Sequence, residues 1–148
     1  MSYLRIFLVV FLLAPIAQDE SPEFLMWTAS ELTRLNAILL AEVAEDHSAR
    51  VTLADYGNPS GAHRFRFIRR DVDGIPEQHQ YIEDVAFIQS GEGILHLGGE
   101  LGGRTGAGGE FRGTHIVGGI RYPVAAGDIL HIPADVPHRY LVPQGGHV

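Results

Sequence analysis

Cysteine is absent from this chain of 148 residues, and its 11 basic residues are outnumbered by 18 acidic ones. The first absence excludes disulfides, zinc–thiolate sites and a cysteine nucleophile. The second gives a formal net charge of -7 and leaves no basic run, which argues against binding to a nucleic-acid backbone. The chain also lacks a long hydrophobic run, because the apolar stretch Ile6–Leu13 falls far below the ~20 residues that span a bilayer. We therefore expect neither a nucleic-acid partner nor a stable membrane span.

The length predicts a single domain, and 18 glycines with 45% hydrophobic residues favour a compact β-rich chain with many turns. Residues 1–17 have the features of a secretory leader. Arg5 supplies a positive start, an apolar run follows, and Ala14–Ala17 is a candidate cleavage region. A leader predicts a periplasmic or secreted protein. The alternative is an N-terminal helix or strand that stays in the fold.

Residues 18–49 are interpreted as a linker followed by an amphipathic helix. Thr28 and Glu31 have the spacing of a capping box, in which each side chain bonds the other residue's backbone N–H. Apolar residues follow at helical spacing: Leu32, Leu35, Ile38, Leu39 and Val43. This pattern predicts a helix from about Ala29 to Ala44, packed on the outside of the β domain.

Residues 50–148 are predicted to form the β domain. His63–Ile68 alternates, with Phe65 and Phe67 on one face and Arg64 and Arg66 on the other. Asp84–Gln89 and Ile94–Leu97 are expected to pair as a hairpin. Further strands are predicted at Arg50–Tyr56, from Glu77 onward, at Ile120–Val124, within Gly127–His138 and at Arg139–Val142.

The predicted β domain also contains a glycine-rich segment and a histidine between two leucines. The glycine-rich residues 98–119 lack a phosphate-loop pattern and a following helix, so they are expected to form a hairpin rather than a phosphate site. His96 alternates with Leu95 and Leu97, and we expect it to face water while the leucines face the core.

The stretch Gly127–His138 predicts a strand that ends on a rigid corner. Its β-forming residues stop at Pro133, which cannot donate a hydrogen bond to a neighbouring strand. The two prolines, Pro133 and Pro137, fix the bend that carries His138 in a defined direction. Asp135 lies within this bend and tolerates the left-handed conformation better than most residues. A histidine on such a corner is a candidate metal ligand.

This stretch resembles the second motif of the cupin family. That motif reads Gly, five residues, Pro, any residue, Gly, two residues, His. The chain has Gly127, Pro133 and His138 at the matching positions, and only the inner glycine is replaced, by Asp135.

The first cupin motif, His-x-His, three or four residues, Glu, six residues, Gly, is also recognisable. The chain has Glu77 and His79 at the two His positions, Asp84 at the Glu position and Gly91 at the Gly position. It is further similar to small single-domain bacterial cupins with a leader, one helix and a Gly109–Gly113-like hairpin segment. The resemblance implies an all-β protein, a small cupin-type jelly-roll barrel preceded by one α-helix, and a homodimer.

By the same resemblance, Glu77, His79, Asp84 and His138 would point into one cavity and bind a metal. Two imidazoles with a carboxylate suit Fe, Mn, Ni or Zn as divalent ions. Asp84 is shorter than Glu and either binds the metal or orients His79. The alternative to a metal site is that the two acids are solvated or salt-bridged and the two histidines only hydrogen-bonded.

Three further residues are weighed as participants in chemistry. Tyr81 is either a proton donor to substrate or a packed tyrosine, and His131 is either an acid–base group or a residue of the wall. Arg112 either clamps a carboxylate or forms a surface salt bridge.

The predicted function is an exported metal-dependent enzyme, of dioxygenase, isomerase or lyase type, acting on a small organic molecule. The main alternative is a non-catalytic cupin that binds a small ligand such as a sugar or organic acid, and the altered first motif favours it. A storage-type cupin is a third possibility, disfavoured by the small size.

Overall fold

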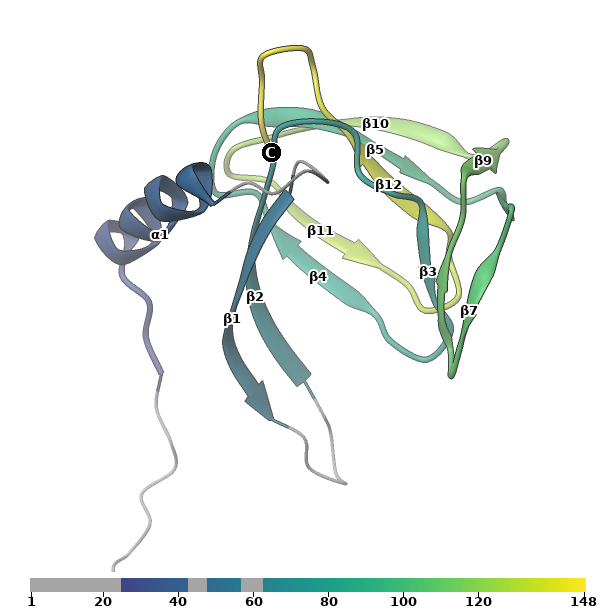
Figure 1. The fold of residues 1–148 in the computed structure, drawn as a ribbon, viewed down its shortest axis with the longest axis horizontal. Helices are drawn as coiled ribbons and strands as arrows, with labels where there is room; N and C mark the ends of the chain where they lie inside the picture. Colours follow the sequence, from purple (N-terminus) through teal and green to yellow (C-terminus); the bar gives the residue numbers. More distant parts are fainter. Residues whose placement is uncertain (1–24, 43–47, 57–62) are drawn as a thin grey trace, which may run out of the picture.

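The computed structural model describes residues 25–42, 48–56 and 63–148, so the predicted leader and the turn at 57–61 lie outside the described residues. The chain folds mainly into antiparallel strands with one helix, which confirms the all-β prediction (Figure 1). In the part that the structure describes, no helix is long and apolar enough to cross a membrane.

The helix α1 spans Ala29–Ala41 and begins with the predicted capping box. The Thr28 backbone N–H donates to Glu31 at 2.8 Å, and the Glu31 N–H donates to the Thr28 hydroxyl at 3.3 Å. The helix ends before the predicted Ala44, which lies outside the described residues. Its buried residue is Leu39, and α1 packs against β1 (Ser48–Tyr56) and β2 (His63–Arg70).

The strands form one larger sheet and three pairs. The larger sheet has the order β10-β5-β12-β3-β8-β7, and the pairs are β1–β2, β4–β11 and β6–β9. Across the described residues these pairings do not close into a barrel, so the jelly-roll barrel stays a prediction. The remaining strands are β3 Glu77–His79, β4 Asp84–Phe87, β5 Glu92–Leu97, β6 Glu100–Gly102, β7 Thr105–Ala107, β8 Glu110–Arg112, β9 His115–Val117, β10 Ile120–Ala125, β11 Ile129–Ile132 and β12 His138–Leu141.

The predicted hairpin between Asp84–Gln89 and Ile94–Leu97 is wrong. The strand β4 pairs with β11, placing Asp84 opposite Ile132, whereas β5 pairs with both β10 and β12. Alternation in sequence identifies a strand but carries no information about its partner, and here each strand pairs with a partner that is distant in the chain. Long-range pairing of this kind brings Asp84 to the end of β11, next to the corner that carries His138.

His96 is buried, contrary to the prediction that it faces water. It lies in the middle strand of the β10-β5-β12 layer, opposite Arg121 on one side and Arg139 on the other. Its Nε2 is 2.7 Å from the carbonyl oxygen of Gly118, in the loop between β9 and β10. That loop covers the face of β5 on which a solvent-exposed histidine was expected. The other ring nitrogen, Nδ1, is buried and has no hydrogen-bond partner among the described residues, so only one of the two ring nitrogens is compensated for its burial.

The hydrophobic core lies between β5, β10 and β11. Its buried side chains are Ile88, Leu95, Val124 and Ile132, and Tyr140 on β12 packs against them. Burial of such side chains contributes about 1.5–3 kcal/mol each. The core therefore fixes the end of β11 and the start of β12, which are the two sides of the corner that carries His138.

Candidate metal centre

The corner between β11 and β12 adopts the conformation that its sequence predicts. Asp135 has a φ of 63°, so it takes the left-handed conformation of the glycine it replaces in the motif. Its backbone N–H donates to the carbonyl of His79 at 2.7 Å, and the Gln78 amide donates to the Asp135 carbonyl at 3.0 Å and carboxylate at 2.9 Å. These bonds tie β3 to the corner, and His138 stands opposite Glu77 in the β12–β3 pairing.

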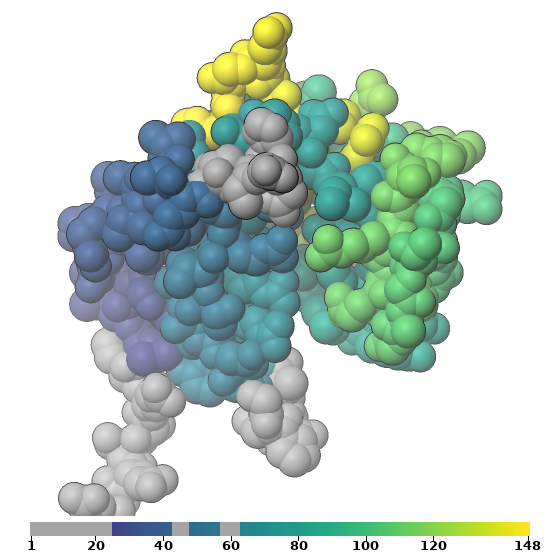
Figure 2. All heavy atoms as spheres, in the orientation of Figure 1, coloured from purple at the N-terminus to yellow at the C-terminus, as the bar shows by residue number. Residues whose placement is uncertain are grey.

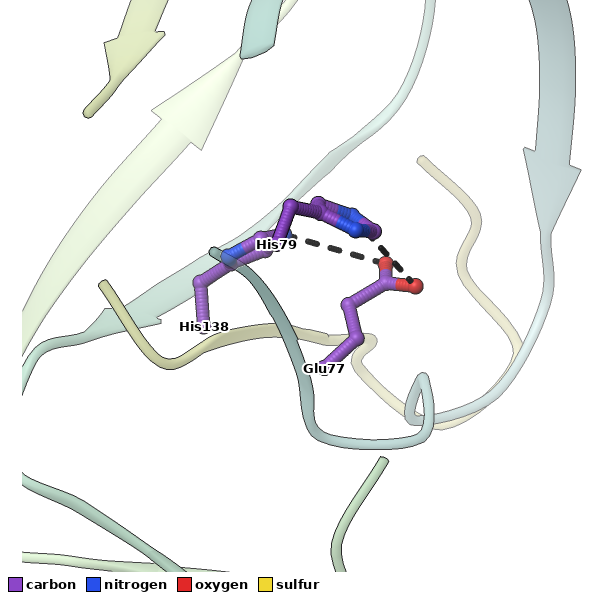
Figure 3. Close-up of side chains that lie close together, drawn as sticks. All are labelled: Glu77, His79 and His138. Carbon is purple, nitrogen blue, oxygen red and sulfur yellow. Dashed lines mark ion pairs between the residues drawn. The ribbon is translucent and has the colours of Figure 1, made fainter. Parts of the chain in front are cut away.

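Glu77, His79 and His138 come together as one group (Figure 3). Each offers one ligand atom, and these atoms lie within 4.8 Å of one another. The Nε2 of His138 is 3.8 Å from a Glu77 carboxylate oxygen, and the Nε2 of His79 is 4.0 Å from the other oxygen. The His138 side chain is only 3% exposed. These three residues form a group that can hold a metal ion.

The second nitrogen of each imidazole is already bonded, which fixes the direction of the first. The Nδ1 of His138 is 3.0 Å from the Val136 carbonyl oxygen. A carbonyl only accepts, so Nδ1 carries the proton and the neutral ring keeps its lone pair on Nε2. The Nδ1 of His79 is 2.8 Å from the Glu110 carboxylate, with the same consequence. Both lone pairs therefore point toward the acids, the arrangement in which a histidine binds a metal.

Asp84 lies beside the same two imidazoles. One of its carboxylate oxygens is 3.4 Å from the Nε2 of His138 and 3.6 Å from that of His79. Glu77 forms an ion pair with Arg70, whose guanidinium is 3.6 Å from the carboxylate. The structure thus gathers all four residues that the cupin resemblance implies as ligands, with Asp84 in contact with both histidines rather than with His79 alone.

The charges at the centre stabilise one another. Burial alone would raise the pKa of Asp84, but a hydrogen bond from His138 and the nearby positive groups, Arg66 among them, outweigh it and lower that pKa. Burial alone would lower the pKa of His138, yet Asp84, the Val136 carbonyl and Glu77 together raise it. Without an ion, this opposite-charge pairing compensates the burial of His138, and a divalent cation would replace the imidazolium proton in that role.

Of the other predicted participants, Tyr81 and His131 lie apart from this group and Arg112 lies beside it. Tyr81 lies after the end of β3 and is 75% exposed, so it is not a packed tyrosine. His131 lies on β11 opposite Val85, is exposed, and has its Nε2 3.2 Å from the carboxylate of Glu83. Arg112 lies opposite Glu77 in the β3–β8 pairing and lines a cavity together with Glu77 and His79.

Sequence reasoning gave no role to Glu110, Gln78 and Arg70, which support the centre. Glu110 orients His79, Gln78 bonds the corner at Asp135, and Arg70 holds Glu77. Of these three, only Glu110 could have been found from the sequence, since it is the acid within the Gly109–Gly113 segment that resembles a cupin hairpin. Its partner could not be read from the sequence, because the contact depends on β8 lying beside β3.

Two imidazoles and a nearby carboxylate form a donor set that suits divalent Fe, Mn, Ni or Zn and leaves coordination positions open for a small molecule. Comparison of the chain with protein-family models, with curated proteins and with solved structures finds no match. Interpretation of the site therefore rests on its own geometry.

Proposed function

We propose that the protein binds one divalent transition-metal ion through His79, His138 and Glu77, and acts as a metal-dependent enzyme on a small organic molecule. The observation that carries this proposal is the orientation of the imidazoles. Both Nδ1 atoms bond other groups, and both Nε2 atoms face the carboxylates of Glu77 and Asp84. If the two histidines served only as hydrogen-bonding residues, there would be no reason for each Nδ1 to be held by a separate group so that both Nε2 atoms face the same place.

Within this proposal the chain is an exported, homodimeric cupin whose strands form a jelly-roll barrel. The two quoted motifs support that view, because the residues they single out come together at one centre. A bound ion of this class supplies Lewis-acid or redox chemistry. The protein contributes the rest: His138 in a water-poor position, Glu77 held by Arg70, and Asp84 as an acid that either binds the ion or accepts a proton beside it.

Metal content tests the proposal directly. The purified protein is stripped with a chelator, equilibrated in turn with Mn²⁺, Zn²⁺, Ni²⁺ and anaerobic Fe²⁺, dialysed, and assayed by elemental analysis. We expect about one ion per chain, falling to background in His79→Ala and in His138→Ala. His115→Ala is the matched control, because His115 is exposed on β9 and its Nδ1 bonds the adjacent Thr114 hydroxyl. Equal metal content in all four proteins would disprove the site.

Catalysis is tested on the metal-loaded protein with a panel of small organic acids, alcohols and sugars. Oxygen uptake that requires the loaded ion identifies a dioxygenase, and product formation without oxygen uptake identifies an isomerase or lyase. Binding of a panel member with no turnover in the loaded protein would instead establish the non-catalytic ligand-binding cupin.

A further inference from the structure

A cavity of about 490 Å³ opens beside the candidate metal centre. Figure 2 shows it as a hollow between the teal β1–β2 region and the green strands near β7. Glu77 and His79 of the metal centre line it together with residues from β1, β2, β7 and β8. The volume falls within the range of about 300–1,000 Å³ that is usual for small-molecule sites. A molecule in this cavity would therefore touch two of the proposed ligands.

The cavity is rich in arginine although the chain is acidic overall. All 11 basic residues of the chain are arginines, and four of them line this one cavity in a protein of net charge -7. Three are on β1–β2 and are called the arginine wall: Arg50, Arg64 and Arg66. The fourth, Arg112, comes from β8.

The arginine wall follows from strand alternation. Arg64 and Arg66 occupy alternate positions of β2, and Thr52 stands opposite Arg66, so these side chains share the face turned toward the cavity. Phe65 between them lies on the other face, where its ring centroid is 5.3 Å from that of Trp27, just before α1. The face of the hairpin on the side of Trp27 therefore carries Phe65, and the face toward the cavity carries the three exposed arginines.

Within the described residues, Arg64 is the only one of these four arginines with a carboxylate at ion-pair distance. Arg64 is bonded to Asp55, with its Nε 2.7 Å from the carboxylate. For Arg50, Arg66 and Arg112, no carboxylate of the described residues lies within 4.0 Å of the guanidinium. Arg66 interacts with Asp84 at longer range. Guanidinium groups that line one cavity are suited to bind carboxylate or phosphate oxygens.

The geometry points to a small anionic organic molecule as the ligand of this cavity. Its carboxylate or phosphate group would be held by Arg50, Arg66 and Arg112, and its other end would reach Glu77 and His79. Thr52 adds a hydroxyl group, and Phe111 adds apolar surface against the body of the ligand. This inference names the substrate class of the proposed enzyme and rests on that function only for the role of the ion.

Calorimetric titration of the chelator-stripped protein tests the anion site without the metal. The probes are succinate, inorganic phosphate and the neutral succinamide. We expect measurable binding of at least one anion and none of succinamide. Preference for succinate identifies a carboxylate group, and preference for phosphate identifies a phosphate group. Absence of binding by both anions, or equal binding of succinamide and succinate, would overturn the inference.

Neutral variants locate the site. Arg66→Gln and Arg112→Gln should each weaken binding of the preferred anion by about 10-fold to 100-fold, the usual loss for a charged hydrogen bond. Arg34→Gln is the matched control, because Arg34 is exposed on α1 and does not line the cavity, and it should leave the affinity unchanged. Equal affinities in all three variants would also overturn the inference.

The two proposals fail in different measurements. Metal content should be the same in Arg66→Gln, Arg112→Gln and the unmodified protein, because none of these side chains is a proposed ligand. Anion binding that persists in a protein with no metal affinity would refute the metal centre and uphold the anion site. Metal binding without anion binding would do the reverse.

Discussion

The histidine end of the cavity, formed by Glu77, His79, Asp84 and His138, is held by the protein in a different way from the arginine wall. The histidine end is supported on several sides: a backbone bond and the Gln78 side-chain amide join β3 to the corner before β12, and the core packs against that corner. The arginine wall belongs to a two-stranded hairpin. Among the described residues, its backbone hydrogen bonds to the rest of the chain are the two between Arg70 and Val148.

This difference fits two kinds of recognition. A metal ion requires ligand atoms at fixed distances and angles, and so its ligands need second contacts that remove rotational freedom. An organic anion is recognised largely by charge, which exposed arginines on a less constrained hairpin supply without a fixed geometry. The comparison predicts that damage to the core or to the supports of the metal centre, Arg70 at the end of β2 among them, will harm metal binding, whereas changes at the arginine wall will alter anion binding alone.

The largest effect is expected from removing core volume under the histidine end. Ile132 is 2% exposed and immediately precedes the bend to His138, so Ile132→Ala should lower the free energy of unfolding by about 2–5 kcal/mol. Ile129 is the matched control on the same strand, because it is 66% exposed and Ile129→Ala should change that free energy by less than about 0.5 kcal/mol. Urea denaturation followed by circular dichroism measures both. Equal losses would mean that this core does not support the corner.

The next effect tests orientation of a ligand without changing the ligand itself. Glu110→Gln replaces the carboxylate that accepts from the Nδ1 of His79, and the metal affinity should fall by about 10-fold to 100-fold. The stoichiometry of the ion should stay the same, since all three proposed ligands remain. Glu100→Gln is the control, because Glu100 is exposed on β6 and does not line the cavity. Competition with a chromogenic chelator gives both affinities, and an unchanged affinity in Glu110→Gln would contradict the orienting role.

Local signals in the sequence predicted the elements that hold the site. The capping box at Thr28, the alternation of Arg64 with Phe65, and the left-handed Asp135 are each decided within a few residues. The two motif segments also predicted that Glu77, His79, Asp84 and His138 would meet, and the structure brings them together.

Strand pairing decided what the sequence could not predict. The burial of His96 depends on β10, β12 and the loop at Gly118, and the role of Glu110 depends on β8 lying beside β3. Those partners are distant along the chain, and a period of two residues is the same for any partner strand. The arginine wall was foreseeable only in part, as Arg64 and Arg66 on one face of β2. Its position across a cavity from β8 was not.

The smallest effect is expected from Asp55→Asn, which should change anion binding at the arginine wall and leave metal binding at the histidine end unchanged. Asp55 occupies the Nε of Arg64 at 2.7 Å, and both side chains are about half exposed, so their pair should contribute at most about 1 kcal/mol to stability. Asp55→Asn removes a negative charge next to the cavity and frees the guanidinium of Arg64 for a ligand. The affinity for succinate or phosphate, whichever binds, should then rise about two- to five-fold. Metal affinity should not change, because Asp55 does not contact the centre.

Asp55→Glu is the control for this last comparison, since it keeps the charge and should keep the affinity near that of the unmodified protein. The sign of the effect is the informative part. If the carboxylate of Asp55 were needed to hold Arg64 in place for the ligand, Asp55→Asn would weaken anion binding instead. Calorimetry measures whether the anion affinity of Asp55→Asn rises or falls. All proteins are compared at one ionic strength, so that salt screening affects them equally. A weaker anion affinity would show that the Asp55–Arg64 ion pair orders the arginine wall. The arginine wall and the histidine end would then differ less in how firmly their side chains are held than the few backbone bonds of β1–β2 indicate.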